Sequence, residues 1–289
     1  MAWQRALGVL LFLVCAPFAG GLLGGLDRKL SARLQGRQGP PVLQPFYDVY
    51  KLFHKQTIVV NRLQDFLVGG YFIFSIFTGC LFFSGGDLLL AFFALTLAEI
   101  FLFMAACSAN SPYSSMGAQR ELVQIMSYEP MLLLAAIGLY MITGSFFIDQ
   151  VADRGISAIA FLPGMFFGLV FVFIIKFRKS PFDISASHHA HQEIVKGLTT
   201  ELSGSELGLV EVAGWYEDVL LLGLLALFIL NRNPWSILAG VATGLACYFL
   251  LVLVDNLFPR VRWEKMLNWA WAVTLIFGGT NLLVLALVL

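Results

Sequence analysis

Charged residues are scarce in this sequence. They make up 12% of its 289 positions, whereas hydrophobic residues make up 59%, and the mean hydropathy is +0.82. A water-soluble domain carries roughly a quarter charged residues, so a soluble fold is excluded. The length suits one compact helical bundle, because a membrane protein needs little polar surface around its core. We therefore expect an all-α, polytopic membrane bundle that forms a single domain over residues 1–289.

An excess of charge of either sign is also missing. The chain has 18 basic and 18 acidic residues, so its formal net charge is zero and nothing indicates nucleic acid as a partner. Its four cysteines stand singly within apolar stretches, without the CxxC spacing of zinc or iron–sulfur sites. They are interpreted as buried structural thiols: Cys15, Cys80, Cys107 and Cys247.

Signatures of catalysis are absent as well. The sequence contains no phosphate-binding loop, dinucleotide fingerprint, nucleophile elbow or HExxH motif. No catalytic residue and no bound metal or cofactor is therefore expected in this chain. If it takes part in a reaction, its partners hold the reactive cofactor.

Long apolar runs are what the sequence has in abundance. About 20 residues are needed to cross the hydrocarbon layer as a helix, and eight segments come near that length. The first is interpreted as a retained helix and not as a signal peptide, because a basic cluster follows it and seven further spans come after. The eight expected spans cover residues 6–26, 66–84, 87–109, 128–148, 157–176, 213–231, 235–257 and 267–288.

Lysine and arginine predict the orientation of these spans. The loops on one face hold 15 of the 18 basic residues, and the opposite face holds only Arg5, Arg154 and Arg232. Because cytoplasmic loops are enriched in lysine and arginine, both chain termini are placed on the outer face of the membrane.

Two loops on the predicted cytoplasmic face, 27–65 and 177–212, are longer than simple connectors. Long ordered loops usually carry function. The first includes VLQPFYDVYKLFHKQ, in which Val49, Leu52 and Phe53 repeat at helical spacing. This pattern predicts an amphipathic helix that lies along the membrane surface and contacts lipid.

Carboxylates at or near membrane depth are the main functional candidates. Glu99 lies within the third span and Glu129 opens the fourth; an ionised carboxylate there must be protonated, paired or in contact with water. Glu211 and Asp218 share one helix face roughly 10 Å apart along its axis. With Glu217 and Asp255, these acids could form a lateral proton relay, although Glu211, Asp255 and Asp27 could instead be interfacial groups that are solvated or paired.

A histidine cluster, SHHAHQE, places His188, His189 and His191 near Glu193. Its spacing matches no standard zinc site, so no metal is assigned. Imidazole also suits proton exchange near neutral pH, contact with a docked subunit, or plain loop surface.

Three motifs together resemble the family that includes the membrane subunit of energy-converting (group 4) nickel–iron hydrogenases and subunit 1 of respiratory complex I. They occur in the family's order between residues 27 and 204: DRKLSARLQGRQGPPVLQPFYDVYKL, GAQRELVQIMSYEP and KSPFDISASHHAHQEIVKGLTTELSG. The resemblance implies a subunit without a redox centre, which anchors a peripheral electron-transfer arm to antiporter-like membrane subunits. It also implies a cell membrane location in a bacterium or archaeon.

Within the family, these motifs imply positions for docking and for ion transfer. The docking positions are Asp27, Arg28, Lys29, Arg37, Gln44, Asp48, Lys51, Arg120 and Asp183, together with the three histidines. Three relay positions lie in the motifs, namely Glu129, Glu193 and Glu201, and the acids selected above for their place near membrane depth complete the relay: Glu99, Glu211, Glu217, Asp218 and Asp255. The expected partners are the peripheral hydrogenase large and small subunits, an iron–sulfur subunit and an antiporter-like subunit, which together hold the nickel–iron centre and the iron–sulfur clusters.

Departures from the quinone-reducing members favour the hydrogenase branch. The connection after the Gly-Pro turn is shortened, SASHHAHQE replaces an acidic run, and the GEY motif becomes Gly214-Trp215-Tyr216. We therefore expect ferredoxin-driven proton reduction coupled to H⁺ or Na⁺ translocation. The alternatives are a quinone-binding subunit of a complex I-like NADH or F420H2 dehydrogenase, and a freestanding secondary transporter, for which the sequence lacks the expected inverted symmetry.

Overall fold

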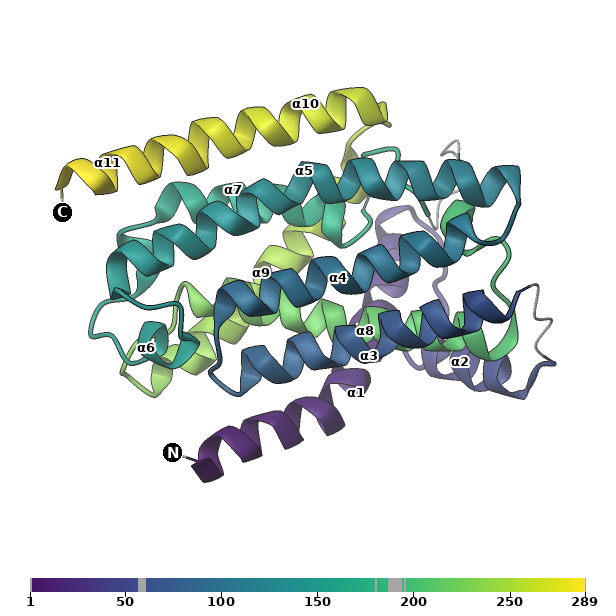
Figure 1. The fold of residues 1–289 in the computed structure, drawn as a ribbon, viewed down its shortest axis with the longest axis horizontal. Helices are drawn as coiled ribbons and strands as arrows, with labels where there is room; N and C mark the ends of the chain where they lie inside the picture. The colour runs from purple at the N-terminus through teal and green to yellow at the C-terminus, as the bar shows by residue number, and fades with distance from the viewer. Residues whose placement is uncertain (1, 57–60, 180, 187–193, 195, 289) are drawn as a thin grey trace.

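The computed structural model describes residues 2–56, 61–179, 181–186, 194 and 196–288, and these residues form an all-α bundle (Figure 1). Within them, extended pairing is limited to two isolated β-bridges, Asp87 with Phe147 and Phe182 with Val261. The helices are α1 (Ala2–Leu34), α2 (Gln44–His54), α3 (Arg62–Phe83), α4 (Leu88–Cys107), α5 (Pro112–Thr143), α6 (Ile148–Ala152), α7 (Pro163–Lys176), α8 (Gly204–Leu227), α9 (Trp235–Leu257), α10 (Trp263–Val273) and α11 (Thr280–Val288). A π-helical segment, Thr274–Gly279, joins the last two, and short 3-10 turns occupy Ala158–Ala160 and Gly197–Thr199.

Six of the described helices are long and apolar enough to cross a membrane: α1, α3, α4, α5, α9 and the α10–α11 rod. The two other expected spans correspond to α7, which has only 14 residues, and to α8, which carries four carboxylates. The membrane class is thus confirmed, whereas the count of eight spans stays a prediction.

Three helices extend beyond the bounds of the expected spans, and two of them, α1 and α8, include parts of the predicted loops 27–65 and 177–212. Helix α1 runs through Asp27 to Leu34, α5 begins at Pro112, and α8 begins at Gly204. At 1.5 Å per residue, the 33 residues of α1 span about 50 Å, more than the ~30 Å hydrocarbon core. Hydropathy detects only the apolar part of such a helix, because its last turns carry charged residues.

The two chain termini lie at the same end of the bundle, and helix α2 lies toward the opposite end (Figure 1). This arrangement agrees with an even number of crossings, while the side of the membrane on which the termini lie stays a prediction. The cysteines are not buried as expected: Cys15 and Cys107 are exposed, and Cys80 and Cys247 are half-buried. Thiols on an apolar helix surface can face lipid as readily as protein.

Tight packing around α1 and α8 positions the site described below. Helix α2 buries Pro45 and Val49 and packs against α1 and α8, which confirms a helix in the amphipathic segment. A Cβ at Gly25 of α1 would collide with the carbonyl oxygen of Val42, so the chain returning to α2 passes directly over this glycine. Contact between backbones at this distance requires a residue without a side chain.

Candidate functional site

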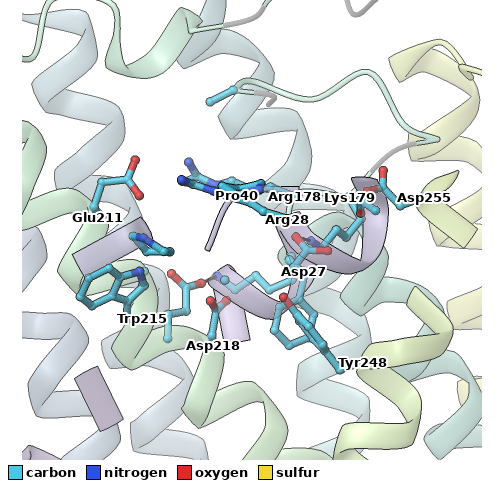
Figure 2. A pocket seen from close by; sticks show the side chains of 18 of the residues that line it. Asp27, Arg28, Pro40, Arg178, Lys179, Glu211, Trp215, Asp218, Tyr248 and Asp255 are labelled. Carbon is cyan, nitrogen blue, oxygen red and sulfur yellow. Dashed lines mark hydrogen bonds and ion pairs between the residues drawn. The ribbon is translucent and has the colours of Figure 1, made fainter. Parts of the chain in front are cut away.

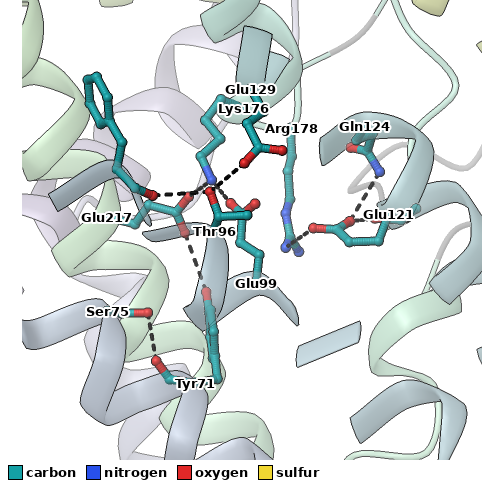
Figure 3. A network of polar contacts seen from close by, with 12 residues as sticks. Tyr71, Ser75, Thr96, Glu99, Glu121, Gln124, Glu129, Lys176, Arg178 and Glu217 are labelled. Atoms are coloured by element: carbon teal, nitrogen blue, oxygen red, sulfur yellow. Dashed lines mark hydrogen bonds and ion pairs between the residues drawn. The ribbon is translucent and has the colours of Figure 1, made fainter. Parts of the chain in front are cut away.

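A buried lysine lies at the centre of the polar network (Figure 3). Lys176, the last residue of α7, forms ion pairs with Glu99 of α4 and Glu217 of α8. Its Nζ atom lies 2.6 Å from Glu217 Oε1, and the three side chains are 3%, 6% and 12% exposed. The hydroxyl of Tyr71 on α3 donates to Glu217 Oε2 over 3.4 Å. The network therefore joins four helices, α3, α4, α7 and α8.

The charge balance of this cluster matters because it is enclosed. One ammonium between two carboxylates leaves one negative charge, which a single proton would neutralise. Separating Lys176 from either acid would strand a buried charge, at a cost of several kcal/mol. Lys176 Nζ also lies 4.6 Å from the centre of the Tyr128 ring, whose negative face stabilises a cation. The expectation that Glu99 must be protonated, paired or in contact with water is met by pairing.

Glu129 extends the network from α5. Its carboxylate accepts a hydrogen bond of 3.2 Å from the hydroxyl of Thr96, which lies one turn before Glu99 on α4 (Figure 3). Glu129 is half-buried, in contrast to Glu99. The two intramembrane acids singled out from the sequence are therefore linked through neighbouring turns of one helix.

A second buried acid, Glu121, was not among the predicted site residues. It lies on α5, forms an ion pair with Arg178 at 3.3 Å, and accepts hydrogen bonds from Ser185 and Gln124. Burial alone lowers the pKa of the Arg178 guanidinium, but Glu121 and other nearby acidic groups raise it, so that the net pKa is above its ordinary value. Arg178 adopts a left-handed backbone conformation (φ 54°), which is costly for a non-glycine residue, just after α7, where its N–H donates to Ile175 O and that of Lys179 donates to Ile174 O.

Sequence spacing offered a weak signal for Glu121, because Glu121 and Gln124 lie one turn apart on α5. Because Glu121 lies between two of the spans expected from the sequence, it was interpreted as a loop residue, and its helical spacing from Gln124 was not used. The pairing with Arg178 joins residues 57 positions apart, so only the fold could reveal it.

Asp183, in the Pro-Phe-Asp motif, is a buried clamp. Its carboxylate binds the guanidinium groups of Arg120 at 2.8 Å and Arg260 at 2.9 Å, and its side chain is 0% exposed. The backbone beside it pairs with the α9–α10 connection, since Val261 N donates to Pro181 O and Asp183 N donates to Val261 O. Asp183 therefore ties the segment after α7 to α5, through Arg120, and to the α9–α10 connection.

The end of α1 is tied to its surroundings by further ion pairs. Asp27 pairs with Lys179, and Arg28 pairs with Asp48 of α2 at 2.8 Å. Gln44 donates to the same Asp48 carboxylate at 2.9 Å. Burial alone raises the pKa of Asp48, but the hydrogen bonds from Arg28 and Gln44 outweigh it, so that the net pKa is lowered. These contacts fix α2 against α1.

A cavity of about 440 Å³ connects the lysine cluster with this face (Figure 2). Its lining includes Lys176, Tyr71 and Trp215, and it extends past Pro40 and Arg37 in the connection before α2. Seven of the predicted acidic and basic positions line it: Asp27, Arg28, Arg37, Glu211, Glu217, Asp218 and Asp255. The proposed relay acids of α8 therefore face one common space.

Other predicted positions lie elsewhere. Glu201 is half-buried after the 3-10 turn and is not part of the cavity lining, Lys29 is half-buried, and Lys51 is exposed. His188, His189, His191 and Glu193 lie outside the described residues. Within the described residues, no group of three or more His, Cys, Asp or Glu side chains could hold a metal ion.

The chain is similar to known proteins over nearly its whole length. Residues 7–286 match the family model described as NADH dehydrogenase. Hydrogenase-4 component C of Escherichia coli is 29% identical over 275 residues (86% of each chain), and a subunit of the NADH-quinone oxidoreductase from Carboxydothermus hydrogenoformans is 30% identical over 289 residues (89% of this chain and 81% of that one). Formate hydrogenlyase subunit 4 of E. coli is 27% identical over 256 residues (83% and 81%).

A similar fold occurs in a solved structure, that of the membrane-bound sulfane sulfur reductase, an archaeal respiratory membrane complex. The TM-score is 0.86 at 24% identity, and the match covers 97% of this chain and 99% of that one. At this identity the likeness concerns the fold alone. All of these similar chains are named as parts of larger oxidoreductase complexes or were solved within a complex, which leaves the freestanding transporter without support.

Proposed function

Because this chain belongs to the NADH dehydrogenase family of membrane subunits, we propose that it anchors an energy-converting hydrogenase complex and couples its redox reaction to ion translocation. In this proposal, reduced ferredoxin delivers electrons to the peripheral arm, protons are reduced to hydrogen there, and H⁺ or Na⁺ is exported through the membrane part. The similarity to hydrogenase-4 component C and formate hydrogenlyase subunit 4 supports the hydrogenase branch.

One observation supports the coupling role: Lys176 lies between Glu99 and Glu217 and lines a cavity that carries charged groups of both signs. A proton or cation that arrives through the cavity can replace the ammonium at one carboxylate. Lys176 then pairs more closely with the other, and the charge passes toward α4 and Glu129. Each state keeps the buried charges paired, which lowers the barrier to transfer in an apolar bundle.

The face formed by the end of α1, α2 and the segment after α7 is the proposed docking surface for the peripheral subunits. Its ion pairs, Arg28–Asp48 and Asp27–Lys179, join three separate segments. A redox-linked shift in the docked arm would move these segments together, and with them the wall of the cavity. The partners proposed are the hydrogenase large and small subunits, an iron–sulfur subunit and an antiporter-like subunit, with the nickel–iron centre and the clusters held by those partners.

The test is to separate electron transfer from pumping. The complex is assembled with Glu217→Gln or Glu129→Gln, and inverted membrane vesicles are supplied with reduced ferredoxin while hydrogen and the ion gradient are measured. Both variants should evolve hydrogen with a gradient reduced at least severalfold, whereas Glu264→Gln, at an exposed acid of α10, should behave as the unmodified complex. Full gradients in both relay variants would refute the coupling role.

A quinone-binding subunit is the second candidate, favoured by the cavity beside α2 and by the relatives that are named as parts of NADH-quinone oxidoreductase. The many charged groups that line the cavity disfavour an isoprenoid quinone, which needs an apolar channel. Photolabelling the intact complex with an azido-quinone discriminates between the two. Labelling of the segment 35–56 would favour the quinone enzyme, whereas hydrogenase subunits that co-purify without labelling would favour the hydrogenase.

A further inference from the structure

The connection between α9 and α10 forms a second, shallow pocket. Its volume is about 300 Å³, and it is lined by Arg260, Val261, Arg262, Lys265 and Trp269. Three of these five residues are basic. The pocket is separate from the cavity beside Lys176, since the two share no lining residue.

Two of the three basic groups are available to a ligand. Arg260 is held by Asp183, but Arg262 and Lys265 are exposed, and neither forms an ion pair within the described part of the chain. The one acidic residue of α10, Glu264, is exposed and does not line the pocket. The pocket therefore carries spare positive charge.

Backbone groups add to this positive potential. Helix α10 begins at Trp263, and among the described residues no side chain caps its N-terminus. Uncapped N–H groups and the positive end of the helix dipole attract anions, phosphate above all. Val261 is fixed by its backbone pairing with Pro181 and Asp183, so the rim of the pocket is rigid.

Apolar surface borders the pocket. Trp269, which lines the pocket, is 47% exposed, and Leu257 and Phe258, which precede Arg260 at the end of α9, are exposed as well. The α10–α11 rod lies along the outer edge of the bundle (Figure 1). Tryptophan is enriched where hydrocarbon meets headgroups, so the pocket lies at the depth of a lipid headgroup.

We propose that this pocket binds the phosphodiester headgroup of an anionic phospholipid. Arg262 and Lys265 bind the phosphate through charge-assisted hydrogen bonds, the N-terminus of α10 faces it, and the acyl chains lie against the exposed surface of the rod. Because Arg260 and Val261 also hold Asp183, the bound lipid stabilises the segment after α7, which is part of the proposed docking surface. Lipid binding itself depends only on the membrane location of the chain.

The experiment measures lipid binding to the intact complex that contains the full chain. Phosphatidylglycerol and phosphatidylcholine with identical acyl chains are titrated in detergent, and bound lipid is resolved by native mass spectrometry. The unmodified complex should retain phosphatidylglycerol preferentially. Each basic residue contributes roughly fivefold to the binding of an anionic headgroup, so the double variant Arg262→Gln/Lys265→Gln should lose about twenty-five-fold in affinity at this site.

Matched variants separate this site from general surface charge. Arg232→Gln removes an exposed arginine from the α8–α9 connection and should leave the preference unchanged. The charge-preserving variant Arg262→Lys/Lys265→Arg should bind as the unmodified complex does, which also verifies that the segment tolerates substitution. Equal retention by the unmodified complex and the double glutamine variant would overturn the proposal. Displacement of the lipid by inorganic phosphate at the same concentration would overturn it too, because the ligand would then be a free anion.

Discussion

The ammonium nitrogen of Lys176 lies 2.6 Å from a carboxylate oxygen of Glu217, in the interior of the helix bundle. The same lysine pairs with Glu99, so a single cation holds two acids that come from helices far apart in the sequence. In an apolar surrounding, such a pair is worth little as net stability but is costly to break. The pairing of Lys176 is therefore better evidence of a functional role than of a stabilising one.

Replacement of Lys176 by methionine should destabilise the protein by about 3–5 kcal/mol, because both carboxylates lose their counter-charge within the bundle. Thermal unfolding in detergent measures the loss. Adding Glu99→Gln and Glu217→Gln to the methionine variant should restore much of the stability, since the charges that need compensation are then gone. Lys51→Met, at an exposed position of α2, is the control and should have little effect. An equally large loss in the triple variant would show that packing, and not charge, is responsible.

Asp183→Asn should loosen the segment after α7. The amide can still accept a hydrogen bond but no longer neutralises Arg120 and Arg260, so we expect a loss of about 2–4 kcal/mol. Limited proteolysis between residues 177 and 203 measures the loosening of this segment, and the melting temperature measures the stability of the whole protein. The matched control is Asp149→Asn, which breaks an exposed pair with Arg5 (side chains 54% and 47% exposed) and should cost less than about 1 kcal/mol. Similar losses in the two variants would contradict the role of Asp183 as a clamp.

Two adjacent glycines of α1 test how closely the connection before α2 passes over α1. Gly25→Ala should cost about 1–3 kcal/mol, because its Cβ would overlap the backbone carbonyl of Val42, which cannot turn aside as a side chain can. Gly24→Ala should be neutral or stabilising by up to about 1 kcal/mol, since no atom of the described residues lies within 4 Å of the added carbon. Chemical or thermal denaturation compares the two variants. Equal effects would mean that the Val42 contact is not maintained in the protein.

The Arg28–Asp48 pair predicts a small dependence of stability on pH. The pKa of Asp48 is lowered in the folded chain, so its contribution is fully present above the ordinary value near 4 and is lost as pH falls through the lower folded value. Because the side chains are 37% and 39% exposed, the contribution is at most about 1 kcal/mol. Asp48→Asn should therefore be less stable than the unmodified protein at pH 7, and the difference should vanish in acid. A difference that stays constant with pH would rule out this ionic contribution.

Sequence patterns predicted the membrane class, a helix within residues 42–56 and the position of Glu99 inside a helical span, because each depends on local composition and spacing. The limits of α1, α5 and α8 were misplaced, because hydropathy ends where charge begins and the helices do not. Arg120 was assigned to a loop for this reason, although it is a helical residue that reaches Asp183.

Apolar length and ordered motifs can be recognised without a fold, so they were enough to indicate that the chain crosses a membrane and to suggest its family. Which charges meet depends on how the helices pack. Lys176 looked like one more basic residue at the end of a span, counted with the cytoplasmic loop. Its role became visible once α4, α7 and α8 were packed together, because its partners lie 77 and 41 positions away, and electrostatic pairing depends on distance in space, not along the chain.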